Sequence, residues 1–379
     1  MCDFLHEREC VKYIDEMAER MGNELYPADL QRLTRRSFVG RSAGLLAASG
    51  VTGVLIAGCG DDDDSGSGGG GDGSVEEVTF LTIIPLNLGF ITELIGDING
   101  HFRKEGLQLN IQSTRGSAQA LQSVLQGSAL TSRVGAIETV IAIANQDAPL
   151  VNICMQWHKS PIGFASSKED PLMEPADWRG KKMGIPSEGG TSEWTLDLVL
   201  ASGGVPLDEV ERQVVGFSPG TFDLVEKDRI DGYVIGSVEI VRFPKEVPQA
   251  VVVDPSEFIE EGQCYVTSQR QLEENKDQLQ AYMNATRAAT EDVLADQDNG
   301  FKKIIELVRK EHDFPELQED EVARGVLQQQ VDAWFFAGEE NLLKTVPENW
   351  QKVYDQVVDV ELAEGGKDPE PWFTNELVS

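Results

Sequence analysis

Several side chains that could bind a small molecule stand at the ends of predicted strands. Three of them are carboxylates, those of Glu138, Glu188 and Glu239. They share this set with one guanidinium, that of Arg115, and with the flat ring of Trp157, on which a ligand could stack. A dedicated anion site would gather basic groups and avoid carboxylates. The set therefore favours a neutral or amine-bearing heteroaromatic ligand, and the alternative for each glutamate is an exposed charge at the rim of a cleft.

The turn at residues 187–192 reads Ser-Glu-Gly-Gly-Thr-Ser and precedes a predicted helix. Glycine lets backbone N–H groups approach a ligand closely, and a helix that opens at Thr191 or Ser192 offers unpaired donors. A plain helix-capping turn is the alternative interpretation, and capping can coexist with ligand contact. No Lys-Ser or Lys-Thr pair follows the glycines, so a phosphate-binding loop is not predicted.

An alternation of strands and helices positions these residues. Apolar runs predict buried strands, among them residues 78–84, 150–157, 162–167, 210–217, 231–235 and 263–268. Residues spaced as on one helical face predict helices between many of them, such as 191–201. Repeated β-α units predict mainly parallel sheets that helices cover on both faces. After residue 268 the pattern is helical only, which predicts a helical C-terminal tail.

In open parallel sheets, ligands bind beyond the carboxyl ends of the strands. We therefore expect the ligand to contact residues that follow the predicted strands. The candidate ligand-binding residues are Asn87, Thr114, Arg115, Ser117, Glu138, Trp157, Ser187, Glu188, Gly190, Thr191, Ser192, Ser237 and Glu239.

Cys59 is a candidate for a different chemistry, the attachment of lipid to its thiol. It follows Ile-Ala-Gly at the end of a weakly apolar run, residues 42–58, and this arrangement resembles a lipoprotein box. The paired arginines at 35 and 36 resemble a twin-arginine export signal. We therefore expect residues 1–58 to be a targeting signal, Cys59 to be the lipidated first residue, and residues 59–77 to be a flexible acidic tether.

An alternative interpretation of residues 42–58 is a short transmembrane helix, although their glycines dilute its hydrophobicity. The sequence leaves open whether residues 1–33 are a native leader or a start-site error.

The chain has 379 residues, of which 65 are acidic and 32 are basic, for a formal net charge of −33. Such an excess repels phosphate groups, so nucleic acid and anionic lipid headgroups are excluded as electrostatic partners. A high-salt habitat and an acidic extracytoplasmic surface explain the charge equally well. Only Cys154 and Cys264 belong to the predicted folded body, and we expect buried free thiols, with a disulfide as the alternative. Because cysteines and histidines show no metal-ligand spacing, neither a metal nor another cofactor is predicted.

Several short motifs, taken in order and spacing, resemble one known family over most of residues 78–290. The matching segments are residues 135–142, 146–151, 160–163, 177–182 and 231–233. They resemble the solute-binding lipoproteins of ABC importers for sulfonates, nitrate-like anions and thiamine-pyrimidine precursors. Residues 126–131 depart from the family because they lack its acid-aromatic pair, and the cysteine-rich signature of the related fungal thiamine-pyrimidine synthase is absent.

The resemblance implies an α/β, two-lobed type II periplasmic-binding fold, in which each lobe is a mainly parallel sheet flanked by helices. The expected limits are 78–165 for the first part of lobe 1, 166–261 for lobe 2, and 262–379 for the return to lobe 1 and the C-terminal helices. Crossings between the lobes near 161–167 and 263–268 would act as hinges.

The resemblance also implies a function. It implies a lipid-anchored receptor on the outer face of the cytoplasmic membrane, which captures a small organic solute and delivers it to the permease and ATPase subunits of an ABC importer. Pyrimidine or thiamine-precursor-like heteroaromatics are the preferred ligands. The alternatives are a sulfonate- or nitrate-like anion receptor, an enzyme related to thiamine-pyrimidine synthesis, and a ligand-sensing module. We expect a monomeric binding protein rather than an enzyme.

Overall fold

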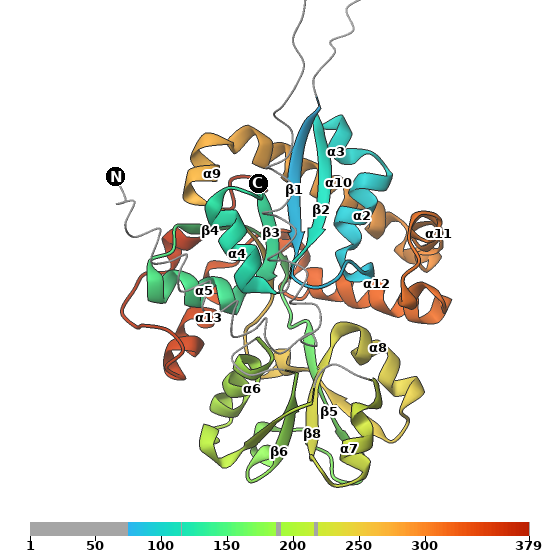
Figure 1. Cartoon of the computed structure of the whole chain (residues 1–379), viewed down its shortest axis with the longest axis vertical. Helices are drawn as coiled ribbons and strands as arrows, with labels where there is room; N and C mark the ends of the chain where they lie inside the picture. Colours follow the sequence, from blue (N-terminus) through green and yellow to red (C-terminus); the bar gives the residue numbers. More distant parts are fainter. Residues whose placement is uncertain (1–74, 115, 187–190, 216–218, 379) are drawn as a thin grey trace, which may run out of the picture. The chain divides into compact units, whose positions relative to one another are not determined.

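The computed structural model describes residues 75–378, except for 115, 187–190 and 216–218. Within these residues the strands form two five-stranded sheets, and helices flank each of them (Figure 1). The chain runs from the first sheet into the second and then returns to the first through β10.

The first sheet has the strand order β2-β1-β3-β10-β4. Its strands are β1 (Glu76–Thr82), β2 (Leu107–Ser113), β3 (Thr131–Gly135), β4 (Leu150–Trp157) and β10 (Gln263–Ser268). β1 pairs in parallel with β2 and β3, whereas β10 lies antiparallel between β3 and β4.

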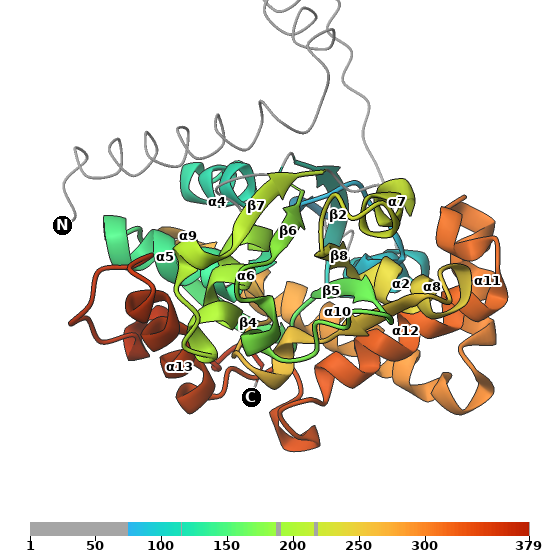
Figure 2. The ribbon, with the colours of Figure 1, turned by 90° about the horizontal axis from the view of Figure 1, so that it is seen from below.

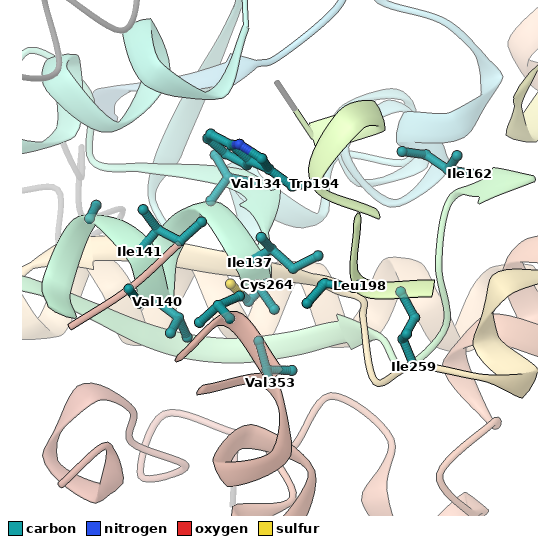
Figure 3. Packing of buried hydrophobic residues seen from close by; sticks show 14 of the residues in the cluster. Val134, Ile137, Val140, Ile141, Ile162, Trp194, Leu198, Ile259, Cys264 and Val353 are labelled. Carbon is teal, nitrogen blue, oxygen red and sulfur yellow. The ribbon is translucent and has the colours of Figure 1, made fainter. Parts of the chain in front are cut away.

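Helices cover both faces of this sheet, because alternate residues of its buried strands point to opposite sides. In β10, Cys264 and Val266 belong to one apolar cluster, and Tyr265 between them belongs to another. The first cluster includes residues of α4 (Ser117–Gln126), α5 (Ala136–Gln146) and α13 (Pro347–Asp359), and the second includes residues of α3 (His101–Lys104) and α10 (Lys276–Ala295). Figure 3 shows the first cluster, in which Ile137 of α5 lies close to Cys264 and Val353 of α13.

The second sheet has the order β7-β6-β8-β5-β9. Its strands are β5 (Ile162–Ser167), β6 (Lys182–Ile185), β7 (Glu211–Val214), β8 (Gly232–Gly236) and β9 (Ala250–Val253). β6 pairs in parallel with β7 and β8, and β5 lies antiparallel between β8 and β9. Its helices are α6 (Thr191–Ser202), α7 (Phe222–Glu226) and α8 (Ser237–Glu246), and Figure 2 shows α6 apart from α7 and α8.

The helical tail begins where the sequence predicts it. Ser268 caps α9 (Gln269–Glu274), because its hydroxyl accepts a hydrogen bond from the backbone N–H of Gln271 at 3.1 Å. The chain continues through α10, α11 (Lys302–Glu311), α12 (Asp320–Trp334) and α13. α2 (Ile91–Ile98) packs on α10, so the tail covers helices of the first half of the chain.

Each described sheet is mainly parallel, as expected, because four of its strands run in one direction and only the crossing strand, β10 in the first sheet and β5 in the second, runs antiparallel to its neighbours. Two sequence-based limits need correction. The expected limit at residue 165 cuts through β5, all of which belongs to the second sheet. β1 begins at Glu76, so the expected tether of residues 59–77 extends two residues too far.

Cys154 and Cys264 are buried free thiols, as expected. Burial raises the pKa of the Cys264 thiol to about 12, which keeps it protonated and unreactive. No helix within the described ranges has both the length and the hydrophobicity to cross a bilayer. The segment 42–58, which we considered as a membrane span, lies outside those ranges.

Candidate ligand-binding site

Glu138 is the point at which three helix N-termini meet. Its own helix, α5, begins two residues earlier, and its side chain is only 3% exposed. The carboxylate oxygen Oε1 accepts a hydrogen bond from Ser117 Oγ, in the first residue of α4, at 3.0 Å. It also accepts one from Thr191 Oγ1, in the first residue of α6. Helix N-termini favour negative charge, so this position suits a carboxylate. The structure thus brings together three of the predicted site residues. Ser117 and Glu138 come from helices beside the first sheet, and Thr191 comes from a helix beside the second sheet.

The second oxygen of Glu138, Oε2, is buried and has no hydrogen-bond partner among the described residues. It lies directly over Gly135, the last residue of β3, where a Cβ would stand only 2.0 Å away. The backbone of Gly135 is extended, with φ −68° and ψ 148°, so the glycine gives the carboxylate space and is not needed for the backbone conformation. An unpaired buried oxygen costs about 1–3 kcal/mol, and more when it is charged. Oε2 is therefore a ready acceptor for a donor group on a ligand.

Glu261 is a second buried carboxylate, which the sequence analysis did not identify. It is 4% exposed, and it lies just before β10, where the chain returns to the first sheet. Its Oε2 accepts a hydrogen bond from Ser160 Oγ at 2.5 Å, and Thr195 Oγ1 lies 3.3 Å from each of its oxygens. Burial raises its pKa to about 8, and the nearby charge of Glu138 adds to the effect.

One face of α6 therefore serves both carboxylates. Thr191 and Thr195 stand four residues apart, one helical turn, and each donates its hydroxyl to a different glutamate. The Thr-x-x-x-Thr spacing in the sequence places the two hydroxyls on one face of the helix, but it does not indicate that Glu138 and Glu261 are their partners.

Arg133, in the middle of β3, is the second residue that the sequence analysis missed. Its side chain is 2% exposed, and Nη2 donates a hydrogen bond to the carbonyl of Gly89 at 2.5 Å. The guanidinium carbon also lies 4.7 Å from the centroid of the Phe90 ring. Both contacts come from the 3-10 turn η1 (Leu88–Phe90), which follows β1. Nε and Nη1 are buried and have no partner among the described residues.

Trp157 ends β4 in a different environment from the one expected. The indole is 3% exposed and belongs to an apolar cluster that includes Leu88 and Trp334. Apolar side chains therefore pack around the described indole, and a stacking role for Trp157 stays a prediction. The hydrogen-bonding group Nε1 of the indole lacks a partner among the described residues.

The other predicted site residues occupy strand and helix ends. Asn87 caps η1 by accepting a hydrogen bond from the backbone N–H of Gly89 at 2.8 Å. Thr114 donates its hydroxyl to the carbonyl of Thr82 at 2.9 Å, and Ser192 is buried in α6. Ser237 and Glu239 begin α8 and are half-buried. Outside the described residues lie Arg115, Ser187, Glu188, Gly190 and Cys59. A ligand-binding role stays a prediction for every residue named in this paragraph except Cys59, for which lipid attachment stays a prediction.

The two sheets repeat one local arrangement. β3 is followed by Gly135 and Glu138, and β8 occupies the equivalent place in the second sheet, followed by Gly236 and Glu239. In both cases the glutamate folds back over the glycine, since a Cβ at Gly236 would lie 3.0 Å from Glu239 Oε2. No group of three or more metal-ligating side chains occurs in the part of the chain that the structure describes.

Comparison with known proteins places the chain in a family. The family model described as "NMT1/THI5 like" matches residues 87–300, more than half of the chain. The chain belongs to the NMT1/THI5-like family. This match confirms the family resemblance found in the sequence.

A curated relative of this NMT1/THI5-like chain is the riboflavin-binding protein RibY of Chloroflexus aurantiacus. The two are 24% identical over 318 residues, which cover 80% of this chain and 87% of RibY. Among solved structures, the aliphatic sulphonate binding protein SsuA of Escherichia coli matches with a TM-score of 0.60 at 16% identity, over 78% of this chain and 97% of SsuA. The nitrate-binding protein NrtA of Synechocystis matches with a TM-score of 0.60 at 12% identity, over 80% of this chain and 87% of NrtA. These likenesses confirm the two-lobed periplasmic-binding fold.

Proposed function

We propose that this chain is the extracytoplasmic solute-binding component of an ABC importer and that it captures a small nitrogen heteroaromatic solute between its lobes. The observation that carries the ligand class is the buried, unpartnered Oε2 of Glu138, held at the junction of α4, α5 and α6. The relative RibY and the structural neighbours SsuA and NrtA are named as binding proteins, which supports a receptor in preference to an enzyme. Its partners would be a permease and an ATPase subunit on the membrane.

The electrostatics of the site favour a donor ligand over an anion. Glu138 and Glu261 are both buried, and the described side chains that donate hydrogen bonds to their oxygens are hydroxyl groups. A sulfonate or nitrate would place its negative charge beside the Glu138 carboxylate at low dielectric, where like charges repel strongly. A ring N–H or amino group can instead donate to Glu138 Oε2. Riboflavin, which the relative RibY is named for binding, and the thiamine-precursor pyrimidines both carry such donors.

The purified protein should therefore gain thermal stability with riboflavin or with 4-amino-5-hydroxymethyl-2-methylpyrimidine. A ligand at 100 times its Kd adds about 2.7 kcal/mol to the free energy of unfolding, which a thermal shift measurement detects easily. An unsubstituted alkanesulfonate and nitrate serve as anionic controls. A shift with either anion and none with the heteroaromatics would overturn the proposed ligand class.

We also propose that the protein is anchored by lipid on Cys59, at the outer face of the cytoplasmic membrane. Changing Cys59→Ala should move the mature protein from the membrane fraction into the soluble fraction, because a diacylated cysteine is its only proposed attachment. Immunoblots of fractionated cells measure the distribution. If the variant stays in the membrane at the wild-type level, residues 42–58 act as an uncleaved helix instead.

A further inference from the structure

We propose that Arg133 and Glu138 form a paired subsite that recognises a ring edge carrying an acceptor next to an N–H donor. The amide edge of a pyrimidinone and the amidine edge of an aminopyrimidine are the two chemical forms of such an edge. This inference rests on the proposed function and deepens it, since it assigns the side chains that would select the ligand.

Arg133 is a buried cation with unused donors. Only Nη2 of its guanidinium has a hydrogen-bond partner, and Nε and Nη1 have none among the described residues. Glu93, a buried carboxylate on the same side of the sheet, is already occupied. Its two oxygens accept hydrogen bonds from Tyr265 Oη and from Thr92 Oγ1. A charged group with unmet donors is costly in the interior, so the free edge of Arg133 is suited to an acceptor from outside the chain.

The register of β3 places Arg133 and the unpartnered oxygen of Glu138 over one face of the sheet. Arg133 and Gly135 are alternate residues of β3, so their side-chain directions share one face of the sheet. The register agrees, because Arg133 pairs with Tyr265 and Gly135 pairs with Gln263, again alternate residues. Glu138 Oε2 stands 2.0 Å from the position that a Cβ at residue 135 would take, so the carboxylate occupies the space that a side chain at this position would fill. Neighbouring positions on one face of a strand lie about 7 Å apart.

The two side chains therefore offer complementary groups on one face. Arg133 can only donate, and an ionised Glu138 can only accept. A ligand edge with a carbonyl or ring nitrogen toward Arg133 and an N–H toward Glu138 would satisfy both. A sulfonate offers acceptors alone, and an ammonium offers donors alone, so each would leave one buried side chain unpaired. Discrimination of this kind is strong, because the rejected ligand leaves the protein's polar groups unmet.

Fluorescence titration with riboflavin and 3-methylriboflavin tests this pairing. Methylation at N3 removes the N–H and keeps both flanking carbonyls. Wild-type protein should bind 3-methylriboflavin at least tenfold more weakly than riboflavin. Glu138→Gln should weaken riboflavin by a similar factor but add little to the loss for the methylated flavin. Arg133→Met should weaken both flavins, since both retain the carbonyls.

Arg133→Met keeps the length of the side chain and removes a buried charge, so it should fold, and its thermal midpoint without ligand confirms this. Arg133→Lys is the companion variant, because it retains the charge but loses the planar pair of donors. Wild-type affinity for riboflavin in both Arg133 variants would overturn the subsite and leave the proposed function standing. Failure of wild type to bind either riboflavin or the aminopyrimidine would instead overturn the proposed ligand class.

A crystal structure of the protein without added ligand also tests the subsite. An ordered solvent molecule hydrogen-bonded to both Arg133 and Glu138 Oε2 would support it. A direct Arg133–Glu138 ion pair, or an empty gap between the two, would overturn it.

Discussion

Replacing Glu261 with glutamine should make the protein more stable than wild type at pH 9, with a difference that becomes small at pH 5. The folded state raises the pKa of Glu261 from 4.5 to about 8, because the carboxyl is buried near Glu138 and Asp254. Between these values the unfolded chain ionises and the folded chain does not, so wild type loses stability as the pH rises. The loss is complete above about pH 8 and amounts to ~4–5 kcal/mol. Glutamine does not ionise, so the variant does not lose this stability as the pH rises.

Urea unfolding at pH 5, 7 and 9 measures this difference. The amide oxygen of glutamine can still accept from Ser160 and Thr195, so the hydrogen bonds of the site are kept. Glu260→Gln is the matched control, because it makes the same change in net charge one residue earlier, where the carboxylate pairs with Lys352 at 2.9 Å. If the curves for Glu261→Gln and wild type stay parallel from pH 5 to pH 9, Glu261 is not held protonated by burial.

Adding one methyl group at Gly135 should expel the Glu138 carboxylate from its position. Alanine adopts the backbone angles of Gly135 without strain, so the cost of Gly135→Ala comes from the collision with Oε2. We expect a loss of about 1–3 kcal/mol in the free energy of unfolding, as for other overpacked sites. Binding of the heteroaromatic ligand should weaken at least tenfold, because Glu138 can no longer present its free oxygen.

A double-mutant cycle separates this collision from other effects. In a Glu138→Ala background the Cβ of residue 135 meets no carboxylate, so Gly135→Ala should cost far less there. An equal cost in both backgrounds would show that Glu138 does not lie over Gly135. Gly236→Ala provides a comparison in the second sheet, where the carboxylate of Glu239 is 3.0 Å away and can shift more easily.

The sequence was sufficient for most elements of the fold. The predicted strands 150–157, 162–167 and 263–268 match β4, β5 and β10, because each is a buried apolar run between turn signals. Direction could not be predicted in the same way. β5 and β10 are buried as thoroughly as parallel strands would be, and burial alone carries no information about which way a strand runs.

The site was predictable only in part. Glu138, Ser117 and Thr191 follow strands or open helices, so the rule for parallel sheets places them at one edge. Glu261 follows another glutamate and precedes glycine, a pattern typical of an exposed loop, and its burial depends on hydroxyls from residues 160 and 195. Arg133 lies in a five-residue strand between Ser132 and Val134, where nothing in the local sequence indicates that its donors are unmet.

The direction of β1 fixes where the rest of the chain joins the folded body. β1 starts at Glu76 and runs parallel to β3, which ends beneath Glu138. Val75 and Glu76 therefore lie at the end of the first sheet opposite Glu138, so the chain enters the described fold at the end of the sheet away from the proposed solute-binding residues.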